Sequence, residues 1–231
     1  MLKLANLNQY YGSSHTLKDV SLSIEAGTCT VLMGRNGVGK TTLMQCITGL
    51  LPLKSGATYL GERDISRLPA EDRAAAGIGY VPQGRQIFPL LTVEENLRIG
   101  LRARRDGGQK VPDLVYELFP VLKEMLRRRG GDLSGGQQQQ LAIGRALVTE
   151  PDVLLLDEPT EGIQPNVVHD IGSIILKLNK EIGLTVVLVE QKLPFARRVG
   201  DVYMLMDRGV IVANGPMAEL SEDLVRQYLT V

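Results

Sequence analysis

The chain has 231 residues, of which 44% are hydrophobic and 23% are charged, an ordinary globular composition whose core needs no disulfide or structural metal. Its 26 Lys and Arg residues balance its 26 Asp and Glu residues, which argues against a general affinity for nucleic acid or an anionic membrane. No apolar run approaches the roughly 18 residues of a spanning helix, and the N-terminus has no signal or transit pattern, so we expect a cytosolic protein without a nucleic-acid partner.

Short apolar segments fill the first third of the chain and predict strands. These segments are LKLANL (2–7), LKDVSLSI (17–24), CTVLM (29–33), ATYLG (57–61) and GIGYV (77–81). Helical patterns beginning at Gly39 and in PAEDRAAAG (69–77) interrupt them, which indicates a mixed sheet with early helices. Cys29 and Cys46 fall inside a predicted strand and helix without metal-site spacing, so we interpret both as reduced packing residues.

The segment GRNGVGKTT (34–42) separates the strand at 29–33 from a helix. It fits the phosphate-loop pattern G-x-x-x-x-G-K-[ST], in which backbone N–H groups at a helix start surround phosphates. In this pattern Lys40 reaches the β and γ phosphates, and the Thr41 hydroxyl binds magnesium. The alternative is a glycine-rich turn with a surface lysine, but the preceding strand and following helix favour nucleotide binding.

The pattern changes from sheet to helix at Thr92. The residues Thr92 to Glu95 form a capping box, and the segment 112–129 adds helical periodicity with no strand between. We therefore predict one domain, residues 1–231, whose core comprises 1–88 and 148–231 and whose all-helical insertion comprises 89–147.

The motif LSGGQ opens the last helix of this insertion. Ser134 and Gln137 form a capping box, and taken alone that structural role is favoured, since caps are common. Gly135 and Gly136 cost the helix roughly 1 kcal/mol each, which makes sense if a second anion approaches their amides. Two phosphate-binding helix starts for one γ phosphate predict a dimer, with each nucleotide between the loop of one chain and the SGG turn of the other.

The apolar strand in VLLLDEP (153–159) ends in two carboxylates. Open α/β sheets bind ligands at the carboxyl ends of their strands. There Asp157 suits magnesium binding, directly or through water, and Glu158 can polarise the attacking water. The alternative is an ordinary exposed pair of carboxylates at a strand end, and the presence of the phosphate loop argues against it.

The last third alternates apolar strands with helices, as in a buried parallel sheet. LTVVLVE (184–190) and DVYMLMD (201–207) are the predicted strands. RGVIVANG (208–215) predicts the second arm of a hairpin, and GPMAELSEDLVRQYL (215–229) predicts a closing helix.

The motifs GRNGVGKTT, VPQ, LSGGQ and LLLDEP, in this order, resemble the ATP-binding subunit of an ABC transporter over essentially the whole chain. The resemblance implies an α/β fold with a P-loop NTPase core, a mixed sheet, an N-terminal antiparallel β region and an inserted all-helical subdomain. ATP and Mg²⁺ are the implied cofactors. The implied catalytic residues are Glu158, as the base, and Gln191; the metal site comprises Thr41, Gln83 and Asp157. The implied nucleotide contacts are Tyr11, Gly34, Asn36, Gly37, Gly39, Lys40, Thr41, Thr42, Ser134, Gly135, Gly136 and Gln137.

Three of these residues carry particular roles or alternatives. Tyr11 would stack on adenine, and the alternative is a turn aromatic that packs on the first hairpin. Gln83 would sense magnesium and the water. Gln191 stands where the family usually has histidine; an amide can hydrogen-bond a γ phosphate but cannot shuttle a proton.

The segment TEGIQPN also departs from the family, because it lacks the usual S-x-L-D sequence, and this leaves coupling through Glu161 to Gln164 open. Both departures resemble the branch that serves branched-chain amino acid and amide importers. GRNGVGKTT, VPQGRQIFP and EGIQPN are most similar to its urea importer member. We therefore expect an importer ATPase for urea or short amides, with a branched-chain amino acid importer as the alternative.

The resemblance also implies the partners. The helical insertion and the segment Gln83 to Pro89 would dock on a membrane permease at the cytoplasmic face of the bacterial inner membrane. A second ATPase subunit, identical or related, would complete the dimer, and an external binding protein would select the substrate. A soluble ABC-type clamp on DNA or the ribosome is a rival, although this chain has one ATPase half and neutral charge. A small-molecule kinase fits poorly, because of LSGGQ and the absence of a second-substrate lid.

Overall fold

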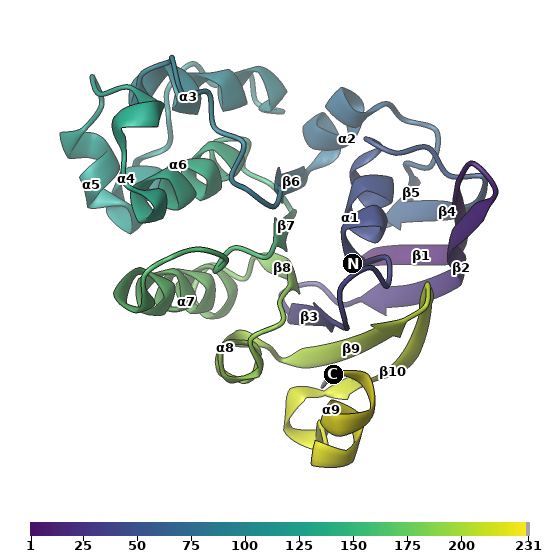
Figure 1. Ribbon diagram of the computed structural model, residues 1–231. Coiled ribbons are helices and arrows are strands. Elements are labelled where there is room, and N and C mark those ends of the chain that lie inside the picture. The colour runs from purple at the N-terminus through teal and green to yellow at the C-terminus, as the bar shows by residue number, and fades with distance from the viewer. Residues whose placement is uncertain (230–231) are drawn as a thin grey trace.

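Two β-sheets organise the computed structural model, which describes residues 1–229 (Figure 1). One sheet is four-stranded and antiparallel, in the order β2-β1-β4-β5, and the other is six-stranded, in the order β10-β9-β3-β8-β7-β6. The strands are β1 (Leu2–Tyr11), β2 (Ser14–Ile24), β3 (Cys29–Met33), β4 (Ser55–Leu60), β5 (Arg63–Asp64), β6 (Ile78–Val81), β7 (Val153–Asp157), β8 (Thr185–Val189), β9 (Val202–Asp207) and β10 (Val210–Pro216). The expected α/β fold with an antiparallel N-terminal sheet and a mixed sheet is confirmed.

Helices lie on both faces of the six-stranded sheet, with α1 on one face and α6, α7 and α8 on the other (Figure 1). The helices of the described residues are α1 (Lys40–Thr48), α2 (Ala70–Ala76), α3 (Val93–Ile99), α4 (Asp113–Leu118), α5 (Pro120–Glu124), α6 (Gly135–Leu147), α7 (Pro165–Lys180), α8 (Leu193–Val199) and α9 (Glu222–Tyr228), with short 3-10 helices η1 (Gly100–Ala103), η2 (Gly130–Asp132) and η3 (Met217–Glu219).

Two predicted helical segments are interrupted. The segment 112–129 breaks at Phe119, whose torsion angles (φ −130°, ψ 70°) are not helical. The proline that follows disfavours the helical region for Phe119, and the second helix ends at Glu124. A single closing helix over 215–229 is also wrong: the strand β10 runs to Pro216, and Ser221 caps a new helix, α9, by accepting the N–H of Leu224 at 3.3 Å.

The six-stranded sheet is parallel except for the β9–β10 hairpin. Every residue of β3, β7 and β8 is buried, as expected for parallel strands covered on both faces. In the strand register Val189 pairs with Asp157 on one side and with Leu32 on the other. The segments that follow these three strands therefore leave the sheet at the same edge.

Two hydrophobic cores lie on opposite faces of this sheet. One packs α1 between the two sheets, and the other joins the sheet to α6, α7 and α8 (Figure 1). Cys46 lies in the first core and Cys29 in the second, and burial raises the pKa of each thiol to about 12. Both are free buried thiols, as predicted.

The segment 89–147 contains the helices α3 to α6. Within this described segment the β structure is limited to an isolated bridge between Thr92 and Arg129. Its buried side chains, such as Leu97 and Leu141, belong to the same core as Leu154 of the sheet. Because that core is continuous, the division into a core and an inserted subdomain stays a prediction.

The β9–β10 turn offers a test of the packing. Gly209 has φ +85°, and a Cβ there would lie 2.1 Å from the carbonyl oxygen of Thr16. Gly61 in the β4–β5 turn has φ +60° but no atom within 4 Å of its Cβ position. We expect Gly61→Ala to lower the free energy of unfolding by about 1 kcal/mol, the cost of a left-handed alanine. Gly209→Ala should lower it by about 3 kcal/mol or more, since the backbone must also shift.

Urea unfolding of both variants measures this difference. Equal losses of stability would contradict the close approach between the β9–β10 turn and β2.

Candidate active site

The loop between β3 and α1 depends on its glycines. Gly34, Gly37 and Gly39 have φ of +154°, +79° and +113°, which other residues rarely adopt. A Cβ at Gly34 would also lie 2.3 Å from the carbonyl oxygen of Met206. The helix α1 then begins at Lys40 without a side-chain cap on its first N–H groups. Such a helix start binds anions, because these amides and the helix dipole favour negative charge.

Lys40 closes this loop. Its buried ammonium donates to the carbonyl oxygens of Gly34 at 2.7 Å and Arg35 at 2.8 Å. Burial lowers the pKa of Lys40, and the nearby charges of Glu158 and Asp157 oppose this shift. The loop thus holds a cation beside the helix start, next to the place where phosphates would bind.

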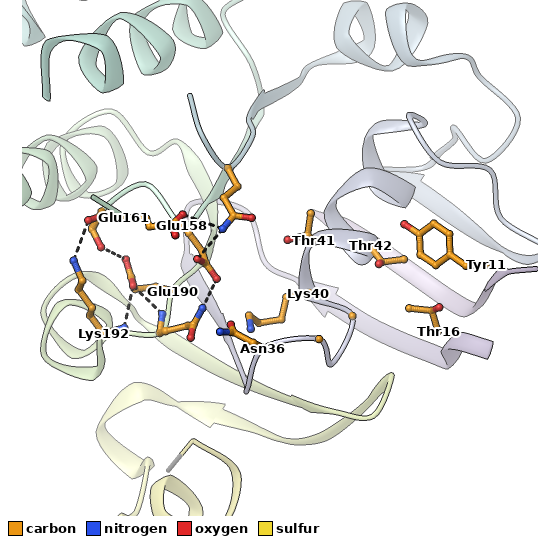
Figure 2. Close-up of a pocket in the computed structure, with 15 residues that line it drawn as sticks. Tyr11, Thr16, Asn36, Lys40, Thr41, Thr42, Glu158, Glu161, Glu190 and Lys192 are labelled. Atoms are coloured by element: carbon orange, nitrogen blue, oxygen red, sulfur yellow. Dashed lines mark hydrogen bonds between the residues drawn. The ribbon is translucent and has the colours of Figure 1, made fainter. Parts of the chain in front are cut away.

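A cavity of about 760 Å³ lies in front of the loop (Figure 2). The predicted residues that line it are Tyr11, Asn36, Gly37, Gly39, Lys40, Thr41, Thr42, Gln83, Glu158 and Gln191. Figure 2 shows Lys40 and Thr41 across the cavity from Glu158, with Tyr11 at one end. Gly34, Asp157 and the segment 134–137 do not line it. The structure therefore gathers residues from several distant predicted motifs around one space.

Tyr11 ends β1 and is 51% exposed at the cavity. The neighbouring Tyr10, not Tyr11, stacks on His15 of the first hairpin, with ring centroids 4.1 Å apart. The aromatic packing that was the alternative for Tyr11 is thus made by its neighbour. An adenine contact at Tyr11 stays a prediction.

Asp157 is a buried carboxylate at the end of β7, only 1% exposed. Neither of its oxygens has a hydrogen-bond partner of regular geometry among the described residues. Burial raises its pKa to about 6, although the nearby Thr41 hydroxyl and the Lys40 charge lower it. An unpaired buried carboxylate beside a hydroxyl fits magnesium, which binds few protein oxygens and takes further ligands from water and phosphate.

Glu158 faces the cavity from a turn with φ +48°. Its N–H donates to the carbonyl oxygen of Val189 at 3.0 Å, which joins the turn to the end of β8. Its carboxylate accepts a hydrogen bond from the amide of Gln191 and another, at 3.3 Å, from the amide of Gln83. Gln83 also donates to Glu161 at 2.9 Å. Two predicted glutamines therefore hold the proposed base.

The structure adds Thr16, Thr160, Glu190 and Lys192 to the cavity wall, residues that the sequence analysis did not single out. Glu190 carried the same signal as Glu158, since each is a carboxylate directly after a buried apolar strand. The other three carried no local signal, because their places depend on contacts between distant segments.

The SGG segment has structural roles within this chain. The Ser134 hydroxyl accepts the N–H of Gln137 at 3.3 Å, and the Gln137 side chain accepts the N–H of Ser134 at 2.9 Å. A Cβ at Gly136 would lie 2.9 Å from Val167 on α7. Close helix packing thus explains one glycine without an anion. The contact of Ser134 to Gln137 with a partner's γ phosphate stays a prediction.

Comparison with known proteins identifies the family of this chain. Residues 17–161 match the family model described as ABC transporter. The chain belongs to the ABC transporter family. It is 41% identical to the high-affinity branched-chain amino acid transport ATP-binding protein BraG of Pseudomonas aeruginosa, over 95% of this chain and 94% of that protein. It is 39% identical to a probable branched-chain amino acid transport ATP-binding protein, LivF, of Archaeoglobus fulgidus, over 96% and 94%.

Solved ABC cassettes have the same fold. A nucleotide-free ATP-binding cassette aligns with a TM-score of 0.84 and 30% identity, over 100% of this chain and 95% of that one. A dimeric cassette in a post-hydrolysis state bound to ADP and Pi aligns with a TM-score of 0.83 and 28% identity, over 94% and 99%. This ABC chain is therefore an ATP-binding and ATP-hydrolysing protein. In residues 1–229 none of the helices is long and apolar enough to cross a membrane.

The raised pKa of Asp157 predicts a pH-dependent stability. Between its ordinary value of 3.8 and about 6, the folded protein keeps a proton that the unfolded chain releases, so the carboxylate destabilises the fold as pH rises through this window. Asp157→Asn removes this penalty. We expect the variant to be more stable by about 2 to 3 kcal/mol at pH 8, since each pH unit of the window is worth about 1.4 kcal/mol.

Urea unfolding in EDTA at pH 4, 6 and 8 measures the effect. The advantage of Asp157→Asn should shrink as pH falls, and an advantage that does not change with pH would contradict the burial cost.

Proposed function

We propose that this chain is the ATPase subunit of an importer for branched-chain amino acids. The relatives at 41% and 39% identity, both named as branched-chain amino acid transport proteins, carry this proposal. They support the alternative of the sequence analysis better than its first choice, urea or short amides. The lipopolysaccharide export ATP-binding protein LptB of Escherichia coli is also similar, with 34% identity over 99% of this chain and 96% of that protein. Because importers and an exporter are both among the relatives, the direction of transport and the transported substrate belong to the proposal.

Hydrolysis in this proposal uses the cavity residues. The loop amides and Lys40 bind the phosphates, and Tyr11 stacks on adenine. Thr41, Gln83 and Asp157 would hold Mg²⁺, which when bound neutralises phosphate charge. Glu158 accepts a proton from the attacking water.

Gln191 can then turn its amide from the Glu158 carboxylate to the γ phosphate. Its side chain donates a hydrogen bond but takes no part in proton transfer, because an amide is too weak an acid and too weak a base to lose or gain a proton near neutral pH. The departure from histidine thus leaves acid–base work to Glu158 alone.

A head-to-tail dimer completes each site with Ser134 to Gln137 of a second subunit, identical or related. ATP stabilises this closed dimer by mass action, and loss of the γ phosphate removes part of the bridge. Opening and closing would drive alternating access in a membrane permease, with an external binding protein delivering the substrate.

Exposed apolar side chains beside the cavity support docking on a permease. Phe88 is 45% and Leu90 79% exposed in the segment that follows Gln83. Arg145 of α6 lies 5.2 Å from the Phe88 ring centroid and donates to the carbonyl oxygen of Gln86 at 2.8 Å. A permease contact here would reach both Gln83 and the helical segment. In this proposal the subunit lies peripherally at the cytoplasmic face of the bacterial inner membrane.

Replacing Glu158 tests the base and the dimer together. We expect Glu158→Gln to lower magnesium-dependent ATP hydrolysis by about 100-fold or more, because the amide cannot accept the proton. The variant should run as a dimer on gel filtration at saturating ATP, while the wild-type rate per chain should rise with protein concentration.

The matched control is Lys40→Ala, which should lose ATP binding in calorimetry and stay monomeric. A Glu158→Gln chain that stays monomeric while it binds ATP would count against the sandwich dimer.

Uptake measurements test the substrate. In cells that lack this chain, we expect import of labelled leucine to fall to background and to return with the wild-type chain but not with Glu158→Gln. Normal leucine uptake with lost urea uptake would overturn the branched-chain proposal and restore the urea alternative.

A further inference from the structure

Glu190 is a buried carboxylate that forms no part of the mechanism above. It follows β8, is 3% exposed, and accepts three hydrogen bonds. The donors are the Thr160 hydroxyl at 2.7 Å and the backbone N–H groups of Gln191 at 2.8 Å and Lys192 at 2.9 Å. A buried carboxylate is costly unless such donors surround it. Three donors therefore offset the cost of burying this carboxylate, and one of them, the Thr160 hydroxyl, comes from the segment that follows β7.

Thr160 is tied to the same strand end a second time. It is buried two residues after Glu158, and its carbonyl oxygen accepts a hydrogen bond from the Lys192 ammonium at 2.9 Å. Figure 2 shows Glu190 and Lys192 beside one another on the Glu158 side of the cavity. The side chain and the backbone of Thr160 are thus both held by residues 190–192.

The turn between these ties is strained. Glu158 has φ +48°, a left-handed conformation that is unfavourable for a residue with a side chain. Such a conformation persists only where the surroundings hold it. On one side the Glu158 N–H donates to Val189 at 3.0 Å, and on the other the Thr160 hydroxyl donates to Glu190. The bond between Thr160 and Glu190 closes the second end of the turn.

We propose that Glu190 is a positioning residue for ATP hydrolysis. Through Thr160 it holds the strained turn that presents Glu158, and through the N–H of Gln191 it orients the residue whose amide binds the Glu158 carboxylate. The inference rests on the proposed role of Glu158 as base. It requires that loss of the Glu190–Thr160 bond slow the chemical step without weakening ATP binding, because the phosphate loop lies on other elements.

Substitutions at Thr160 test this with little change of shape. We expect Thr160→Val to lower kcat tenfold or more, while KM for ATP and the calorimetric Kd change less than threefold. Thr160→Ser keeps the hydroxyl and should retain kcat within threefold. The control is Thr58→Val, which makes the same change at a buried threonine of β4 and should leave kcat unaltered.

Glu190 completes a double-mutant cycle. Glu190→Ala should lower kcat at least as much as Thr160→Val does, because it removes the bond to Thr160 together with the bonds to the N–H groups of Gln191 and Lys192. The double variant should fall no further than Glu190→Ala, since Thr160 has no bond left to lose. Glu190→Gln should retain kcat within threefold, because its oxygen can accept the backbone N–H groups while its amide donates to the Thr160 hydroxyl. Single effects that multiply in the double variant would overturn the proposal.

The two proposals fail in different ways. Full kcat in Thr160→Val, or a fall in ATP affinity equal to the fall in kcat, would overturn the positioning role and leave the base assignment intact. Full hydrolysis in Glu158→Gln would instead remove the base, whatever the Thr160 variants show.

Discussion

The parallel register of β3, β8 and β7 is the constraint on which the site depends. Val189 sits between Leu32 and Asp157, so the phosphate loop, the carboxylate pair and the segment of Gln191 leave the sheet at one edge. The strands are buried on both faces, and a slip of one residue would turn their side chains to the opposite face. The same packing that stabilises the sheet thus places three distant segments within reach of one nucleotide.

Charge is concentrated at this edge at some cost to stability. The Lys40 ammonium donates hydrogen bonds to two carbonyl oxygens of its own loop. Asp157, in contrast, is buried with no hydrogen bond of regular geometry among the described residues. A site with a poorly satisfied carboxylate is destabilised by itself and gains most when a cation arrives. Glu158 adds backbone strain to the same edge. We interpret these features as a trade of stability for function, which active sites commonly show.

Several features of the chain have a structural cause and a functional one at the same time. Ser134 caps α6, and Gly136 makes room for Val167, yet these residues belong to the LSGGQ motif that the family resemblance assigns to a partner's phosphate. These structural roles within one chain do not conflict with a role across a dimer, because capping holds the start of α6 in a fixed position. The continuous core through 89–147 stabilises the helices of this segment by joining their buried side chains to those of the six-stranded sheet.

The sequence by itself determined the phosphate loop, the carboxylates at the end of β7 and the α/β class, because spacing, glycine content and apolar periodicity are local properties. Tertiary structure decided that Gln83 and Gln191 meet at Glu158, and that Thr160 bonds Glu190. These contacts depend on which strand ends become neighbours and on which helices pack. Pairing between distant segments leaves no periodic signal in the chain, and so only the folded arrangement reveals it.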